Sequence, residues 1–215
     1  MTDGHLPPAG DHPALPGRLA DRLLADRLLA DFDQPWPVSH SETIHDSDYI
    51  SLRSDTIVDP SGDEHVRAVV APNGAVAVVV LDDDDRLLLV EQYRHPLGRR
   101  LIELPAGTLD VDGEQPVEAA RRELAEEADL VAASWTSLLK LSMTPGHSTE
   151  EIEVFVATDL RAVADDDLTT REAEEADMAQ WWLPFDQAVD AVLAGRISDS
   201  KTVSAILAVQ VSRAR

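Results

Sequence analysis

The feature that most constrains this chain is a row of carboxylates at helical spacing. Residues 116–128 begin with a proline, which suits a first helical position, and are rich in alanine and glutamate with one leucine, all good helix formers, so they predict a helix. Glu123, Glu126 and Glu127 stand at positions i, i+3 and i+4, so their side chains share one face. Converging carboxylates repel one another unless a cation lies between them, and oxygen-only ligation suits Mg²⁺ or Mn²⁺.

The segment before this helix decides between a binding site and a plain surface. A charge run on a helix is usually a solvated face, and the three glutamates alone would favour that interpretation. Residues 104–107 (LPAG), however, combine a proline-constrained turn with a glycine whose backbone can approach a ligand closely. A turn of this kind entering a carboxylate helix favours a site.

A longer pattern surrounds the glutamates. In sequence order it consists of Gly107, Glu114, Arg122-Glu123-Leu124-Ala125-Glu126-Glu127 and Leu130. It resembles the Nudix hydrolase box, G-xxxxx-E-xxxxxxx-REU-x-EE-x-G-U, in which U is apolar. Two positions depart from the box: the first loop is one residue longer, and Asp129 replaces the last glycine. Because Asp tolerates the left-handed conformation that often ends a helix, neither departure removes a metal ligand.

The resemblance implies roles for the residues of the box. Glu123, Glu126 and Glu127 would hold Mg²⁺, with Mn²⁺ as an alternative, and the backbone carbonyl of Ala106 would add a ligand. Glu127 would thereby belong to the catalytic residues. The residues expected to orient the loop and the helix are Gly107, Glu114 and Arg122.

Other segments are similar to the ADP-ribose pyrophosphatase branch of the family. They are VEQYR at 90–94, ELPAG at 103–107, PGHSTE at 145–150 and SDSKT at 198–202. The substrate-binding residues that this similarity implies are Arg67, Arg94, Glu103 and Glu150. Arg94 has two interpretations, since its guanidinium can fork onto a diphosphate or pair with Glu103. His147 invites a role as general base, but a lone loop histidine is more commonly only exposed.

The base that activates water is expected on the acidic segment 165–177. In this branch a glutamate on the corresponding loop takes that part, and alignment on Asp177 and the following WWLP selects Glu174, with Glu175 as its rival. Ala176 stands where the family often has a second acid. The implied reaction is hydrolysis of ADP-ribose to AMP and ribose 5-phosphate. The alternatives are a pyrophosphatase for another nucleoside diphosphate sugar and a non-catalytic module that binds ADP-ribose.

The implied fold is α/β, a Nudix-type α/β/α sandwich with a mixed sheet, preceded by a small N-terminal β-hairpin region. Residues 74–81 are apolar throughout and predict a strand buried on both faces, and the turn 82–85 would join it to residues 86–94 as a hairpin of the core sheet. Residues 1–35 are expected to be a disordered or helical appendage. Residues 36–70 would form strands with a turn at 59–62, and residues 71–215 the catalytic domain.

The composition limits the chemistry and the kinds of partner that the chain can have. The chain has no cysteine, which excludes disulfides and thiolate chemistry. A net charge of −23 argues against nucleic acid as a partner, whereas a few arginines and divalent cations suffice for a small nucleotide sugar. No membrane-spanning run and no secretion signal stand in the sequence, so we expect a cytoplasmic protein.

The N-terminal strands commonly help form a dimer in this branch, so the resemblance implies a homodimer.

Overall fold

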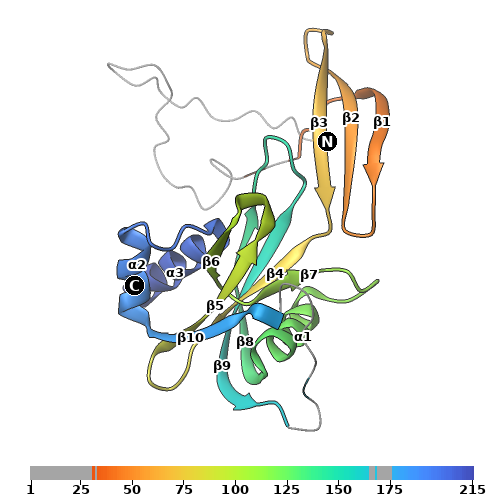
Figure 1. Cartoon of the computed structure of the whole chain (residues 1–215). Helices are drawn as coiled ribbons and strands as arrows, with labels where there is room; N and C mark the ends of the chain where they lie inside the picture. Colours follow the sequence, from red (N-terminus) through yellow and green to blue (C-terminus); the bar gives the residue numbers. More distant parts are fainter. Residues whose placement is uncertain (1–30, 32, 165–167, 169–175) are drawn as a thin grey trace, which may run out of the picture.

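The computed structural model describes residues 31, 33–164, 168 and 176–215 (Figure 1). The predicted N-terminal appendage lies almost wholly outside these residues. The N-terminal sheet is antiparallel, in the order β1-β2-β3. Its strands are β1 (Val38–Asp46), β2 (Ile50–Val58) and β3 (Glu64–Pro72). This sheet projects from the rest of the molecule (Figure 1), and β1 is exposed along its whole length.

The turn between β2 and β3 lies where the sequence predicts it. The Asp59 carboxylate accepts hydrogen bonds from the backbone N–H groups of Ser61 at 2.9 Å and Asp63 at 3.0 Å. Gly62 has φ +93, a conformation that a glycine adopts without strain. The predicted hairpin is therefore present, and β1 joins it as a third strand.

The body of the protein contains two further sheets. A four-stranded mixed sheet has the order β7-β4-β9-β8, in which only β4 and β9 run parallel. Its strands are β7 (Ala106–Thr108), β4 (Ala75–Val80), β9 (Glu151–Ala162) and β8 (Leu130–Ser142). An antiparallel sheet has the order β10-β5-β6. Its strands are β10 (Ala179–Pro184), β5 (Arg86–Arg94) and β6 (Arg99–Glu103), and the short helix η1 (His95–Leu97) joins β5 to β6.

The predicted core hairpin of residues 74–94 is wrong. β4 and β5 belong to different sheets, and only an isolated bridge from Leu81 to Leu87 joins them. A strand has two edges, and both edges of β4 are taken by β7 and β9, while both edges of β5 are taken by β10 and β6. The turn at 82–85 therefore carries the chain from one sheet to the next.

Helices cover both faces of the sheets, which confirms the predicted α/β/α arrangement. Val76, Val78 and Val80 of β4 pack in a cluster with Leu124 of α1 (Pro116–Ala128). The alternate residues of β4 pack with α2 (Phe185–Leu193) and α3 (Ser200–Arg213). Figure 1 shows α1 on one side of the sheets and α2 with α3 on the other. As predicted, the central strand is buried on both faces.

Helix α1 has the bounds that the sequence predicts and ends as expected. Asp129 follows it with φ 55 and ψ 35, the left-handed conformation, and its N–H donates to the carbonyl of Ala125 at 3.1 Å. None of the helices among the described residues is long and apolar enough to cross a membrane.

Candidate active site

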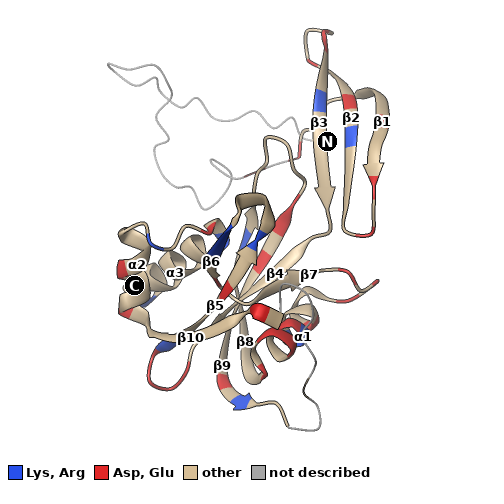
Figure 2. Cartoon of the chain, viewed as in Figure 1, with Lys and Arg blue, Asp and Glu red and all other residues tan. Residues whose placement is uncertain are grey.

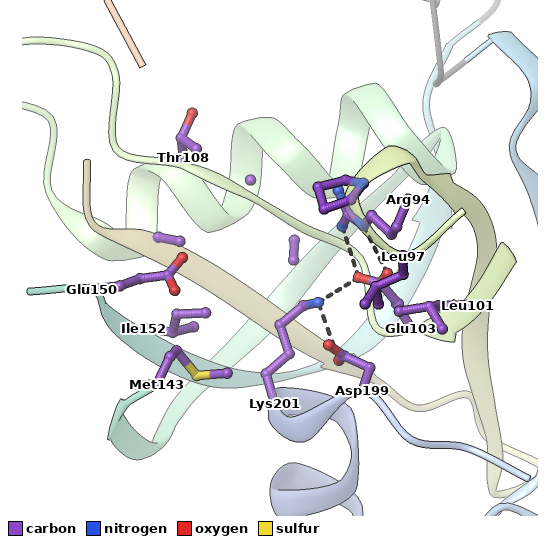
Figure 3. A pocket seen from close by; sticks show the side chains of 14 residues that line it. Arg94, Leu97, Leu101, Glu103, Thr108, Met143, Glu150, Ile152, Asp199 and Lys201 are labelled. Carbon is purple, nitrogen blue, oxygen red and sulfur yellow. Dashed lines mark hydrogen bonds and ion pairs between the residues drawn. The ribbon is translucent and has the colours of Figure 1, made fainter. Parts of the chain in front are cut away.

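A pocket of about 390 Å³ opens where β6, β7, the start of α3 and the ends of β8 and β9 meet (Figure 3). Five residues that the sequence singles out line it: Arg94, Glu103, Ala106, Gly107 and Glu150. In Figure 3 Glu150 lies on one side of the pocket with Met143 and Ile152, and the Arg94–Glu103 pair lies on the other. Segments that are far apart in sequence thus build one cavity.

Gly107 connects this pocket to the carboxylates of α1. A Cβ atom on Gly107 would lie 1.8 Å from Cδ of Glu123, so only glycine lets the strand approach the carboxylate this closely. The Glu123 side chain is buried, and its burial raises its pKa to about 7 even though Arg122 acts in the opposite direction. Burial makes the charged form of Glu123 unfavourable, and a cation bound beside it would stabilise that charged form.

Arg122 supplies the positive charge beside the carboxylates of α1. Its guanidinium pairs with Glu123 at 2.7 Å and with Glu126 at 3.2 Å. It also reaches Glu114 at 3.1 Å and Asp110 at 3.2 Å, so it ties the loop before α1 to the helix. The orienting role of Glu114 and Arg122 stays a prediction, and these ion pairs are the contacts that it would use.

The side chain of Glu127 reaches Ala106 at the start of β7. One of its carboxylate oxygens accepts a hydrogen bond from the backbone N–H of Ala106 at 2.8 Å. Its backbone carbonyl accepts a hydrogen bond at 2.9 Å from the side-chain amide of Gln180 in β10. Glu127 therefore holds the helix, the loop and β10 together while its side chain stays buried beside the pocket wall.

These residues fit a hard divalent cation. In the described part of the chain, no three carboxylate or histidine side chains already stand together as a metal site. The buried oxygens of Glu123 and Glu127 lie on adjacent positions of the helix face that meets residues 106–107, and Glu126 is one turn from Arg122. Mg²⁺ is usually held by one or two carboxylates, waters and substrate phosphates, so this donor set is sufficient.

On the far wall of the pocket, Glu103 holds two cations. Arg94 donates to both of its oxygens, from Nε at 2.8 Å and from Nη2 at 2.7 Å. Lys201 of α3 donates to one of the same oxygens and pairs with Asp199 at 3.1 Å. Burial would raise the pKa of Glu103, but Arg94 and Lys201 hold that pKa below its usual range. The Arg94–Glu103 ion pair considered from the sequence is thus present.

Charge is distributed in keeping with this arrangement. Figure 2 shows mainly acidic residues over α1, and basic residues together with some acidic ones over β5 and β6. The guanidinium of Arg94 lines the pocket, and the carboxylate of Glu123 lies directly behind Gly107 in the pocket wall. The arrangement suits a substrate that carries several negative oxygens.

Comparisons with known proteins agree with the geometry. Residues 71–205 match the NUDIX domain. The chain belongs to the Nudix family. An ADP-ribose pyrophosphatase of Mycobacterium tuberculosis (strain ATCC 25618 / H37Rv) is 45% identical over 169 residues, which cover 79% of this chain and 80% of that protein. A methanol dehydrogenase activator of Bacillus methanolicus is 33% identical, over 81% of this chain and 92% of the relative.

A solved structure is also similar. The crystal structure of an ADP compounds hydrolase has a TM-score of 0.71 and 26% sequence identity, covering 84% of this chain and 95% of that one. The Nudix fold predicted from the sequence is confirmed, including the mixed sheet between helices.

Arg67 and His147 do not line the pocket of Arg94 and Glu150. Arg67 of β3 lines a separate pocket of about 300 Å³ next to residues 145–149, and it donates to the carbonyl of Val66 at 2.9 Å. His147 is exposed, as expected. Its backbone carbonyl accepts a hydrogen bond from the N–H of Val70 at 2.8 Å, and its backbone N–H donates to the carbonyl of Thr144 at 3.1 Å. Glu174 and Glu175 lie outside the described residues.

Sequence reasoning did not single out Lys201. This lysine is only 6% exposed, although it is the second residue of α3, where a lysine would ordinarily be solvated. The signal was available in residues 198–202 (SDSKT), where Asp199 is a favourable N-cap and therefore predicts which turn begins the helix. That the lysine turns inward depends on Glu103, which lies 98 residues earlier.

Proposed function

We propose that this Nudix protein hydrolyses the diphosphate of ADP-ribose to AMP and ribose 5-phosphate. The observation that carries the proposal is the shared pocket, in which Arg94 and Glu150 face a wall that Gly107 joins to the carboxylates of α1. The similarity to an ADP-ribose pyrophosphatase over most of both chains supports the choice of substrate.

The metal would be held by Glu123, Glu126 and Glu127, with the carbonyl of Ala106 as a further ligand. We propose Mg²⁺, with Mn²⁺ as a substitute, and when bound it neutralises negative charge on the diphosphate oxygens. Arg122 and Glu114 keep the helix and the loop in register for these ligands through their ion pairs.

The chain's own cation for the diphosphate is Arg94. Glu103 engages one edge of its guanidinium by two hydrogen bonds, which fixes the plane of the group. The remaining N–H donors can bind phosphate oxygens in the pocket. Glu103 therefore contributes to substrate binding by orienting Arg94, and Glu150 contributes from the opposite side.

Replacing Arg94 with Ala is expected to raise KM for ADP-ribose about a hundredfold, because a charge-assisted contact to phosphate is worth roughly 2–3 kcal/mol. Steady-state kinetics with saturating Mg²⁺ measures the change. Arg99→Ala is the matched control, since Arg99 is the cross-strand partner of Arg94 but does not line the pocket. An unchanged KM in Arg94→Ala would remove this residue from substrate binding.

The water-activating base is proposed to be Glu174, with Glu175 as the alternative. Changing the base to Gln is expected to lower kcat about a hundredfold or more, the usual contribution of a positioned general base. Binding of ADP-ribose in the presence of metal should stay nearly constant, which calorimetry with the slow variant can measure. Each substitution is the control for the other, and full activity in both would exclude both residues.

The preferred substrate can be separated from other nucleotide sugars by rate. We expect kcat/KM to be higher for ADP-ribose than for GDP-mannose, UDP-glucose or other nucleoside diphosphate sugars measured in parallel. A higher value for one of those would assign the same machinery to a different substrate. Binding of ADP-ribose without cleavage of any of them would indicate a non-catalytic binding module.

We also propose a homodimer that forms through the N-terminal sheet. Its exposed apolar side chains support this, among them Ile44 at 60% and Val66 at 66% exposure. Sedimentation should give about twice the chain mass of 23.4 kDa. The monomer mass at micromolar concentration would contradict the proposal. A cytoplasmic location stays a prediction from the sequence.

A further inference from the structure

A closed ring of hydrogen bonds joins the start of α3 to the wall of the pocket. The Asp199 carboxylate accepts from the backbone N–H of Thr202 at 3.0 Å and from its hydroxyl at 2.6 Å. The Thr202 hydroxyl oxygen in turn accepts from the backbone N–H of Leu104 at 2.9 Å. Lys201 bridges Asp199 to Glu103, and the peptide bond from Glu103 to Leu104 closes the ring.

Most of this ring is shielded from water, and the Asp199 side chain is partly buried at 14% exposure. Glu103 and Leu104 are each 1% exposed, Lys201 is 6% exposed and Thr202 is fully buried. In such surroundings an uncompensated charge is costly, because water and salt screen it only weakly. The two carboxylates of the group, Glu103 and Asp199, therefore supply most of the negative charge that balances Arg94 and Lys201.

The two cations compete for one atom. Oε2 of Glu103 accepts a hydrogen bond from Nη2 of Arg94 at 2.7 Å and another from Nζ of Lys201 (Figure 3). Asp199 offers Lys201 a second carboxylate at 3.1 Å. Without that second carboxylate the group would carry one uncompensated positive charge, and Lys201 would draw Oε2 away from Arg94.

We propose that Asp199 is a positioning residue for Arg94, acting through Lys201 and Glu103. By sharing Lys201, it leaves Glu103 able to hold the guanidinium at two points and so to aim it into the pocket. The inference rests on the proposed function, in which Arg94 binds the diphosphate. It adds a residue that lines the pocket and acts on the substrate only through its neighbours.

A simpler role would be that Asp199 only caps α3. Capping accounts for the two hydrogen bonds from Thr202, but it does not require the ion pair with Lys201. Asn is as good an N-cap as Asp, so Asp199→Asn removes the charge and keeps the cap. The two roles therefore predict different results for one substitution.

For Asp199→Asn we expect KM for ADP-ribose to rise about tenfold, the loss of one weakened charge-assisted contact, with kcat within about twofold of the parent. Asp186→Asn is the matched control, because it removes the same charge from the first turn of the neighbouring helix α2, outside the pocket. Calorimetric melting shows whether each variant is folded at the assay temperature. Asp199→Ser, which also caps, replaces Asp199→Asn if that variant is unfolded.

A double-mutant cycle tests the route through Arg94. If Asp199 acts through Arg94, Asp199→Asn should change KM much less in an Arg94→Ala background than in the parent. If the KM changes of Asp199→Asn and Arg94→Ala simply multiply in the double variant, the two residues act independently and the inference is overturned. An unchanged KM in Asp199→Asn itself would also overturn it. The same cycle can be measured as Kd by calorimetric titration of ADP-ribose into each variant. Chelator is present in these titrations so that the substrate is not turned over.

The same data separate the two claims. A parent protein that does not cleave ADP-ribose refutes the proposed function, and the Kd cycle then decides whether Asp199 orients Arg94. A parent protein that cleaves ADP-ribose, combined with an unchanged KM in Asp199→Asn, refutes only the role of Asp199.

Discussion

Replacing Glu127 with Gln is expected to lower kcat for ADP-ribose about a thousandfold, because losing a metal ligand removes roughly 4 kcal/mol of transition-state stabilisation. The fold should be retained. The amide oxygen of Gln can still accept the hydrogen bond that the Ala106 N–H now donates to Glu127, so the contact between loop and helix survives. What disappears is the negative charge offered to the cation.

Steady-state turnover and circular dichroism together measure this prediction. Glu118→Gln is the control, because it removes the same charge from the exposed face of the same helix. A Glu127→Gln protein that is folded and fully active would mean that the carboxylate does not take part in the reaction. An unfolded Glu127→Gln protein would instead show that the carboxylate is structural.

The second large effect is expected at Gly107. A Cβ atom at this position would lie 1.8 Å from Cδ and 2.0 Å from Oε1 of Glu123, far inside any ordinary contact. In Gly107→Ala either β7 or the Glu123 side chain must move, and both form the border between pocket and helix. We expect kcat to fall about a hundredfold, as when a catalytic group is misplaced by about an ångström. We also expect a lower Tm.

Gly146→Ala provides the comparison for Gly107→Ala. No atom lies within 4 Å of the Cβ position at Gly146, so its Tm should stay near that of the parent. Calorimetric melting and turnover of both variants check the prediction. Parent values of kcat and Tm in Gly107→Ala would show that Glu123 can move aside at no cost and that its position is not critical.

Local features of this protein could be predicted from its sequence. Helix 116–128, the left-handed Asp129 and the turn at 59–62 depend on the preferences of neighbouring residues, and all three are present. The buried strand of residues 75–80 follows from an unbroken apolar run. The carboxylates of α1 were recognised because helical spacing alone brings them to one face.

Features that depend on tertiary pairing could not be predicted. The apolar runs before and after residues 82–85 looked like one hairpin, but each strand finds both of its partners elsewhere in the chain. Likewise Lys201 had no visible partner in the sequence, because Glu103 reaches it only once β6 and α3 are packed together. Arg67 lines a second pocket of this chain, and its assignment to substrate binding stays a prediction from the resemblance.

The measurement that tests the account most directly is product analysis. The protein is incubated with ADP-ribose and Mg²⁺, and in parallel with ADP-ribose and chelator, and the products are separated by chromatography. We predict AMP and ribose 5-phosphate in equal amounts with Mg²⁺, and neither with chelator. Unchanged ADP-ribose in both incubations, or equal cleavage with and without metal, would contradict the proposed metal-dependent hydrolysis.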